Sequence, residues 1–139
     1  MNLTELLLNA DVKQVTKLPT ETYEVSRLSK ALGGAFVLEL QAIPTKRMNE
    51  IQQRNMTVGE DGKQEVNLFD LQLATLADGI INEDFKNQEV LKKFGAGTKK
   101  DLFEKILLAG EITAIAGKIN KLSGFEKEKN KKAVEEVKN

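Results

Sequence analysis

The segment of this chain that comes nearest to a known chemical motif is glycine-rich: residues 94–99, with the sequence FGAGTK. A phosphate-binding loop needs the spacing G-x-x-x-x-G-K-S/T directly after a hydrophobic strand. Here that spacing is absent, Thr98 precedes Lys99, and no hydrophobic strand comes before them. We therefore interpret residues 94–99 as a turn between two helices.

Neighbouring carboxylates occur at residues 60–61 and 83–84, where their oxygens could in principle bind a hard cation. An EF-hand loop needs ligands at alternate positions and a terminal glutamate, and neither segment supplies them. A pair of acids could also hydrolyse a glycosidic bond. With six Phe, one Tyr and no Trp, however, the chain has little material for a sugar-stacking cleft. We expect both segments to be solvated loops.

The residue types that enzymes and metal sites use most are missing. The chain has no histidine, which removes the commonest general base and metal ligand. It has no cysteine, which removes disulfides and thiolate metal sites. We therefore predict that the protein is not an enzyme and uses no cofactor or metal.

Length and hydropathy favour one domain in the cytoplasm. At 139 residues the chain can build a single core. No stretch approaches the roughly twenty apolar residues of a membrane span, and Glu5 stands where a signal peptide would carry a basic residue. We expect a domain over residues 1–125 and a charged tail over 126–139, either frayed or disordered, because the tail has too few apolar residues to order itself.

The N-terminal segment predicts a short helix whose Leu3, Leu6, Leu7 and Ala10 share one face. Asn2 and Glu5 have the spacing of a capping box. A helix of about eight residues does not persist alone in water. We expect it to pack on its own core, with docking on a partner as the alternative.

Residues 23–43 alternate between apolar and polar, with glycines in the middle, and so predict an antiparallel β-hairpin with its turn near residues 30–35. A surface helix should follow over about 45–55, with an apolar seam at Met48 and Ile51. Residues 59–63 predict a turn, and 64–66 a short strand. Asn67 should cap a central helix. Its apolar stripe comprises Phe69, Leu73, Leu76 and Ile80.

The last third predicts a short helix over about 87–94 and then a pair of longer ones. Thr98 should cap the first of the pair, and the second should begin at Glu111 after an interruption at Gly110. Gly124 has the position of a left-handed C-cap, and Phe125 that of a Schellman contact on Ile119. The fold class expected is α+β: a mostly helical single domain with a small antiparallel β-hairpin near residues 22–43 and a C-terminal helix pair.

Residues 101–112 (DLFEKILLAGEI) followed by 119–125 (INKLSGF) resemble the XkdN-like family of phage tail assembly chaperones. The order of the other expected elements matches that family over nearly the whole chain to Phe125. The resemblance implies a protein of a phage or prophage that binds the tape measure protein and keeps it soluble until the tail tube assembles around it. It also implies action in the host bacterial cytoplasm and absence from the mature virion. In many phages, ribosomal frameshifting adds a longer form of such a protein.

Apolar side chains of the first helix and of the C-terminal helix pair are the candidates for partner binding, since a groove between amphipathic helices can cover an exposed apolar stripe. They are Leu3, Leu6, Leu7, Leu102, Phe103, Ile106, Ile112 and Ile115. Besides the tape measure protein, the tail tube protein, a frameshifted longer form and a homo-oligomer are partners to consider.

Two other functions stay open. One is a structural tail or connector component of the virion. The other is a small nucleic-acid-binding regulator that uses Lys46, Arg47 and Arg54 of the surface helix together with the lysines of the tail. The balance of 21 basic and 21 acidic residues makes binding to nucleic acid the weaker expectation.

Overall fold

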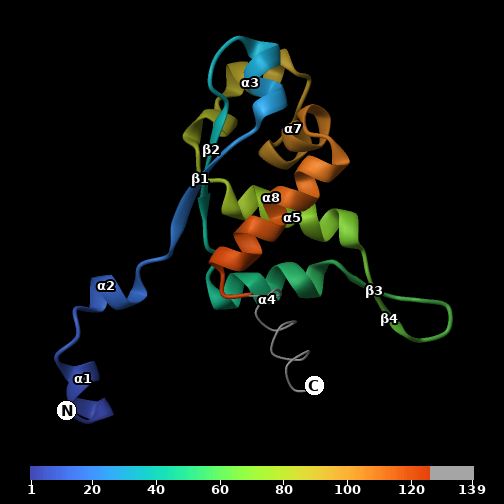
Figure 1. Ribbon diagram of the computed structural model, residues 1–139. Coiled ribbons are helices and arrows are strands. Elements are labelled where there is room, and N and C mark those ends of the chain that lie inside the picture. Colours follow the sequence, from blue (N-terminus) through green and yellow to red (C-terminus); the bar gives the residue numbers. More distant parts are fainter. Residues whose placement is uncertain (126–139) are drawn as a thin grey trace, which may run out of the picture.

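The computed structural model describes residues 1–125, so the predicted charged tail over 126–139 lies outside the described residues. Figure 1 shows a helical domain from which two segments project. The elements, in chain order, are α1 Leu3–Leu8, α2 Val12–Thr16, β1 Thr20–Glu24, α3 Ser26–Leu32, β2 Val37–Gln41, α4 Thr45–Arg54, β3 Met56–Val58, β4 Gln64–Val66, α5 Leu68–Gly79, the 3-10 helix η1 Glu83–Lys86, α6 Gln88–Lys93, α7 Lys99–Ile106 and α8 Ala109–Leu122. The α+β class expected from the sequence is confirmed.

The antiparallel pairing of β1 with β2 is confirmed, with Tyr23 opposite Leu38. The predicted tight turn between them is wrong, because helix α3 connects the two strands. Gly33 adopts a φ of 75° and ends this helix as a left-handed C-cap. The buried Leu28 anchors α3 on the core. A glycine pair between two strands therefore marks a helix end here and not a hairpin turn.

Helix α5 lies at the centre of the domain and packs against α4, α7 and α8. Leu73, Leu76 and Ile80 are buried as predicted, whereas Phe69 is 46% exposed and does not belong to the buried stripe. The contact with α8 is close: a Cβ on Gly79 would lie 2.5 Å from Cδ1 of Ile119. The two helices cross at a position where only a glycine fits.

The predicted helix ends are largely confirmed. The side chains of Asn67 and Thr98 accept hydrogen bonds from backbone amides three residues later. Helix α8 begins at Ala109, earlier than predicted, and Gly110 lies inside it. The carboxylate of Glu111 accepts a hydrogen bond of 2.8 Å from the amide of Leu108, which explains why the helix can begin there.

The end of α8 is a Schellman motif, as predicted. The amide of Phe125 donates to the carbonyl of Asn120 at 3.0 Å, and the amide of Gly124 donates to the carbonyl of Lys121 at 3.1 Å. Gly124 has a φ of 99°, which favours glycine. The expected contact of the Phe125 ring with Ile119 stays a prediction.

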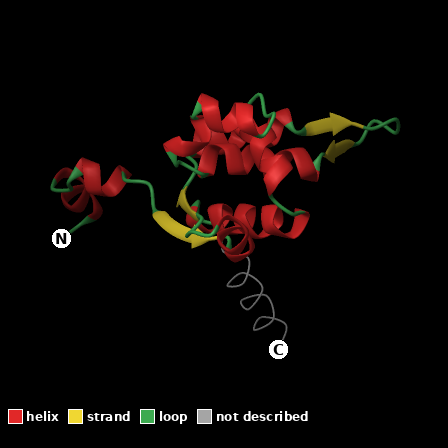
Figure 2. Cartoon of the chain, turned by 90° about the horizontal axis from the view of Figure 1, so that it is seen from above, coloured by secondary structure: helices red, strands yellow, loops and turns green. Residues whose placement is uncertain are grey.

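The expectation that the first helix packs on its own core is wrong. Neither α1 nor α2 contains a buried residue. Two views at right angles show both helices projecting from the domain (Figures 1 and 2). Among the described helices, none has both the length and the apolar character needed to cross a membrane.

Candidate protein-binding surfaces

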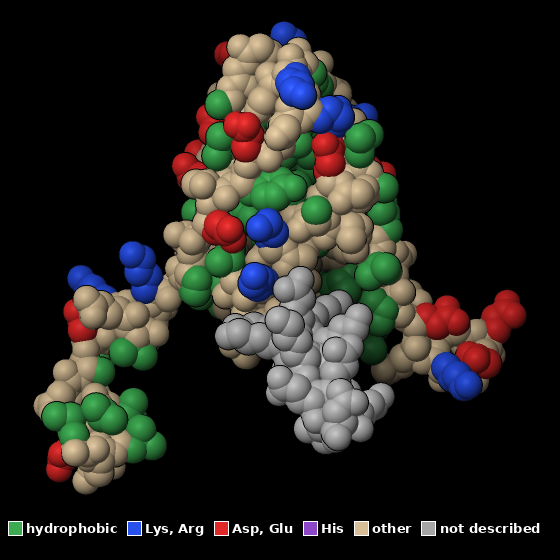
Figure 3. Space-filling view, in the orientation of Figure 1, with side chains coloured by type: hydrophobic (Ala, Val, Ile, Leu, Met, Phe, Trp, Pro, Cys, Tyr) green, Lys and Arg blue, Asp and Glu red, His purple; other side chains and the backbone are tan. Residues whose placement is uncertain are grey.

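The N-terminal arm, defined here as residues 1–17, carries a row of exposed apolar side chains. Leu3, Leu6 and Leu7, all predicted to bind a partner, are 70%, 53% and 63% exposed. Figure 3 shows hydrophobic side chains gathered at the far end of the arm. The other large apolar side chains exposed on the arm are Met1, Leu8, Val12 and Val15.

Local hydrogen bonds shape both helices of the arm. Asn2 Oδ1 accepts from the amide of Glu5 at 2.9 Å and caps α1. Asp11 Oδ1 accepts from the amide of Lys13 at 3.0 Å and caps α2. Helices of six and five residues are far shorter than the roughly twelve residues at which an isolated helix becomes marginally stable. The arm therefore needs a protein surface to hold its helical form.

The root of the arm is fixed to the domain. The carbonyl of Pro19 accepts a hydrogen bond of 2.9 Å from the amide of Ala42. Proline restricts its own φ and disfavours helical backbone at the residue before it, Leu18. Lys17 is also extended, with ψ at 130°. This extended link directs the arm away from the domain.

The candidate partner-binding residues on the C-terminal helix pair lie inside the domain or at its edge. Leu102, Phe103, Ile112 and Ile115 are at most 3% exposed, and Ile106 is half-buried against the core. Phe103 packs edge-on against Phe85, with ring centroids 5.1 Å apart. In this structure the four buried side chains hold α7 and α8 on the domain and offer no surface to a partner.

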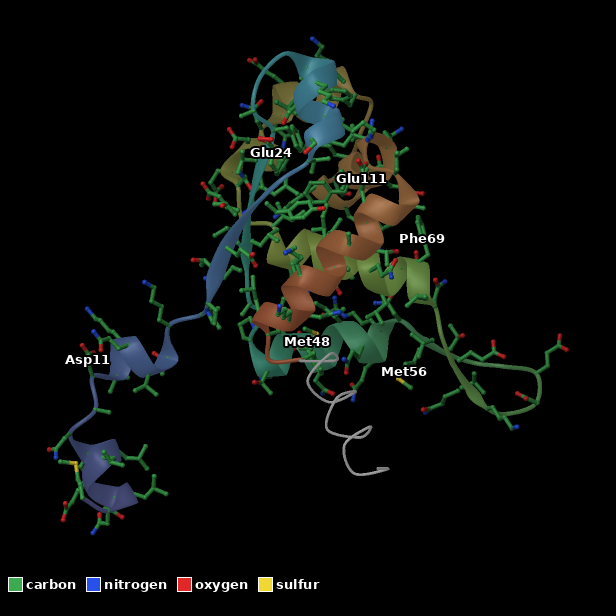
Figure 4. The ribbon with its side chains drawn as sticks, in the orientation of Figure 1. Asp11, Glu24, Met48, Met56, Phe69 and Glu111 are labelled. Atoms are coloured by element: carbon green, nitrogen blue, oxygen red, sulfur yellow. The ribbon has the colours of Figure 1, made fainter. Side chains whose placement is uncertain are left out.

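A hollow lies between α4 and the end of α8, and sequence reasoning did not find it. It holds about 260 Å³ and is lined by Ile43, Thr45, Met48, Asn49, Gln52, Ser123 and Phe125. Ser123 Oγ accepts from the amide of Ile43 at 3.0 Å and so fixes the two sides together. Phe125 is 47% exposed at this hollow. Figure 4 labels Met48 on α4.

A second exposed surface, the hairpin patch, lies on the opposite side of the molecule from the arm (Figures 1 and 2). The predicted strand at 64–66 is confirmed as β4, and it pairs with β3, which the sequence did not reveal. Met56 lies opposite Val66 in this ladder. The patch comprises the exposed residues Met56, Val58, Val66, Leu68 and Phe69, two of which Figure 4 labels.

The basic residues proposed for nucleic-acid binding are partly neutralised. Arg47 forms ion pairs with Asp78 and Glu50. The hydrogen bonds that Arg47 donates to these two carboxylates, above all to Asp78, raise the pKa of Arg47. Lys46 and Arg54 remain exposed on α4. The helix thus lacks the concentrated positive face that a phosphate backbone would need.

The glycine-rich segment at 94–99 is a turn between helices, as interpreted. Gly95 ends α6 with a φ of 66°. The amide of Gly97 is already bound to the Asp101 carboxylate at 3.0 Å, and Lys99 donates to the carbonyl of Ile80. Burial lowers the pKa of Lys99. The lysine thus ties α7 to the end of α5.

Neither acidic segment is arranged as a cation site. Asn82, next to the 83–84 acids, binds the backbone of strand β2: its Oδ1 accepts from the amide of Glu39 at 2.7 Å, and its Nδ2 donates to the carbonyl of Val37 at 3.2 Å. Over residues 1–125, no three side chains among Asp, Glu, His and Cys gather closely enough to hold a metal ion.

Comparisons with known proteins agree with the described fold. The profile of the phage XkdN-like tail assembly chaperone proteins matches residues 4–138. Curated proteins give no match. Among solved structures, the crystal structure of the protein yqbn superposes with a TM-score of 0.56 at 18% identity, over 84% of this chain and 98% of that one. At this identity the superposition shows a shared fold alone.

Proposed function

This chain belongs to the family of phage XkdN-like tail assembly chaperone proteins, and from that membership we propose that it binds the tape measure protein and keeps it soluble until the tail tube forms. We further propose that it acts in the host bacterial cytoplasm as a non-catalytic binder and does not remain in the mature virion. A tail assembly chaperone must hold a tail protein and release it, so its binding surface must not be part of its own core.

The observation that supports this proposal is the N-terminal arm. Leu3, Leu6 and Leu7 lie on one face of α1, and none of them packs on the domain. A tape measure protein is a long helix, and before assembly its apolar stripes are open to aggregation. A short amphipathic helix that needs a surface can pair with such a stripe, and each then covers the other's apolar side chains.

The proposal is tested by co-expressing the tagged full-length chain with the tape measure protein and measuring how much of the latter is soluble and co-purifies. Leu7→Asp places a charge on the apolar face and should abolish capture. Thr4→Asp places the same charge on the same helix, away from that face, and is the matched control. Circular dichroism of both variants should equal that of the wild type.

Three outcomes would contradict the proposal. Capture by Leu7→Asp at the wild-type level would mean that the arm is not the binding surface. Equal loss in both variants would mean that charge on α1, and not its apolar face, matters. Loss of wild-type capture at moderate salt would contradict apolar docking, because screening weakens exposed charge pairs and leaves hydrophobic burial intact.

A further inference from the structure

In the protein without its partner, the N-terminal arm exposes a row of apolar side chains to water. Six leucine and valine side chains of the arm are exposed, by 53% to 80%. Soluble proteins rarely leave contiguous apolar patches of this kind open to water. Something must cover the arm before the tail protein arrives, and the structure offers a suitable surface.

That surface is the hollow between α4 and α8. Its apolar lining residues are Ile43, Met48 and Phe125. Within residues 1–125 the other lining residues are polar and uncharged: Thr45, Asn49, Gln52 and Ser123. A volume of about 260 Å³ exceeds the ~150 Å³ of a protein cavity that can take up benzene. The hollow therefore has room for one or two leucine side chains. Because these lining residues carry no charge, no charged group has to lose its hydration when an apolar helix docks there.

The arm leaves the domain at the edge of this hollow. Pro19, at the arm's root, is hydrogen-bonded to Ala42, and the next residue, Ile43, lines the hollow. The extended link through Lys17 and Leu18 carries the arm outward instead of back over its own domain (Figure 1). Two molecules whose hollows face each other would thus each hold an arm in front of the other's hollow.

We propose that, without its partner protein, two copies of this chain exchange their N-terminal arms, and that each copy seats Leu6 and Leu7 in the hollow of the other. Seating Leu6 and Leu7 removes on the order of 200 Å² of apolar side-chain surface from water in each arm, as judged from the free energy of burying two leucine side chains. Two arms together stay below the ~1,000 Å² of a stable specific interface, so the exchanged dimer is weak and reversible. The exchange is symmetric, so it closes at a dimer and does not continue into a fibre.

Exchange would also regulate capture, a consequence that rests on the proposed function. The same leucines cannot contact a second copy and a tape measure helix at once. A tail protein must therefore compete with the dimer, and its apparent affinity falls with the fraction of free arms. The dimer would protect the arm until a longer apolar stripe displaces it.

Cross-linking tests the arrangement directly, since the natural chain has no cysteine. Full-length Leu7→Cys and Asn49→Cys are mixed and oxidised; neither can form a disulfide within one chain, so a mixed dimer requires contact between copies. Leu7→Cys with Leu32→Cys is the matched control, because Leu32 is 61% exposed at the end of α3. We expect a disulfide between positions 7 and 49 and none between 7 and 32.

Other occupants of the hollow would give other disulfide cross-linking patterns, and each of these patterns would contradict the proposal. An arm that closes on its own hollow gives a disulfide within the double variant Leu7→Cys/Asn49→Cys and no mixed dimer. Arms that pair with each other give a dimer of Leu7→Cys alone. If the mixture stays monomeric, no arm of a second copy occupies the hollow.

Sedimentation equilibrium gives an independent test with the intact chain. Asn49→Arg brings a charged side chain to the rim of the hollow and should raise the dimer dissociation constant at least tenfold. Gln53→Arg, exposed one residue beyond the hollow's Gln52, is the control and should leave it unchanged. Dimerisation of Asn49→Arg at the wild-type level would overturn the proposal.

The two proposals fail separately. Asn49→Arg should capture the tape measure protein at lower concentration than the wild type, because more of its arms are free. If no variant captures that protein while the cross-link persists, the proposed function fails and arm exchange stands. If capture succeeds and the wild type is monomeric at every concentration, exchange fails and the proposed function stands.

Discussion

Arg27 of α3 and Glu111 of α8 form a two-point ion pair across 84 positions of the chain, with Nε–Oε2 at 3.0 Å and Nη2–Oε1 at 2.8 Å. Arg27 also donates to the carbonyl of Ile106 at 2.8 Å, where α7 ends. Glu111 in turn accepts from the amide of Leu108. This pair joins α3 to the junction of the two C-terminal helices.

The pair should make stability depend on pH. The hydrogen bond from Arg27 is the main cause that holds the pKa of Glu111 below its usual value. A lowered folded-state pKa stabilises the fold at any pH above the unfolded-state value of about 4.3, and the gain disappears as pH falls through the folded-state pKa. Glu111→Gln should therefore lower the unfolding midpoint at pH 7. The difference from wild type should shrink below about pH 4, as chemical denaturation across pH would show.

Glu104→Gln, exposed on α7, is the control for that measurement. It removes a carboxylate from the same part of the domain without touching Arg27. An equal loss in both variants, or a Glu111→Gln difference that is independent of pH, would contradict the role given to the ion pair.

Gly79→Ala should destabilise the domain by about 1–3 kcal/mol, the range for overpacking a core. The new methyl group would lie 2.5 to 2.8 Å from three atoms of Ile119, which is fully buried. Urea denaturation measures the cost. Ile119→Val in the Gly79→Ala background should recover part of it by removing the nearest methyl group, giving a favourable coupling in a double-mutant cycle.

Gly117→Ala is the matched control for the packing at Gly79. Gly117 is exposed in α8, and nothing lies within 4 Å of a Cβ built on it. Replacing glycine by alanine inside an exposed helix stabilises by about 0.5–1 kcal/mol. Opposite signs at the two glycines are expected, and the same sign at both would contradict the close crossing of α5 and α8.

Deleting residues 2–17 should leave the domain as stable as before and abolish capture of the tape measure protein. The arm contains no buried residue, so its loss exposes no core. Differential scanning calorimetry measures the midpoint. At a concentration where the wild type is monomeric, a fall of about 4–8 °C, or roughly 1 kcal/mol for a domain of this size, would show that the arm packs on its own domain in solution.

We also expect the folded domain to end near Phe125. Truncation after Glu126 should leave thermal unfolding cooperative, with a midpoint close to that of the full chain. The reason is compositional, because apolar periodicity stops at Phe125 and a charge-rich sequence follows. A fall of more than about 10 °C, which is well over 1 kcal/mol, would show that the remaining residues contribute to the core.

Sequence reasoning succeeded where local chemistry decides the structure. The caps at Asn67 and Thr98 and the alternation along β2 act over a few residues, and all three were predicted correctly. It failed at residues 33–34, because a glycine with positive φ can end a helix as well as turn a hairpin.

The candidate surface was harder to predict, because a helical pattern identifies an apolar face without saying what covers it. Leu7 and Phe103 each belong to a row of apolar residues at helical spacing. In the structure, however, Leu7 is 63% exposed and Phe103 is fully buried. The hollow escaped prediction for a related reason. A hydrogen bond between Ser123 and Ile43, 80 residues apart, joins the two sides of the hollow. No local sequence pattern predicts such a contact.

The absence of buried residues from α1 and α2 has an evolutionary consequence. Most mutations lower stability, and selection removes those that take a protein below the threshold for folding. Mutations in the arm do not face this threshold, because the stability of the domain does not depend on the arm. Recognition can therefore diversify quickly as the partner's sequence drifts, while the residues around Ile119 and Gly79 remain under a separate and stricter constraint.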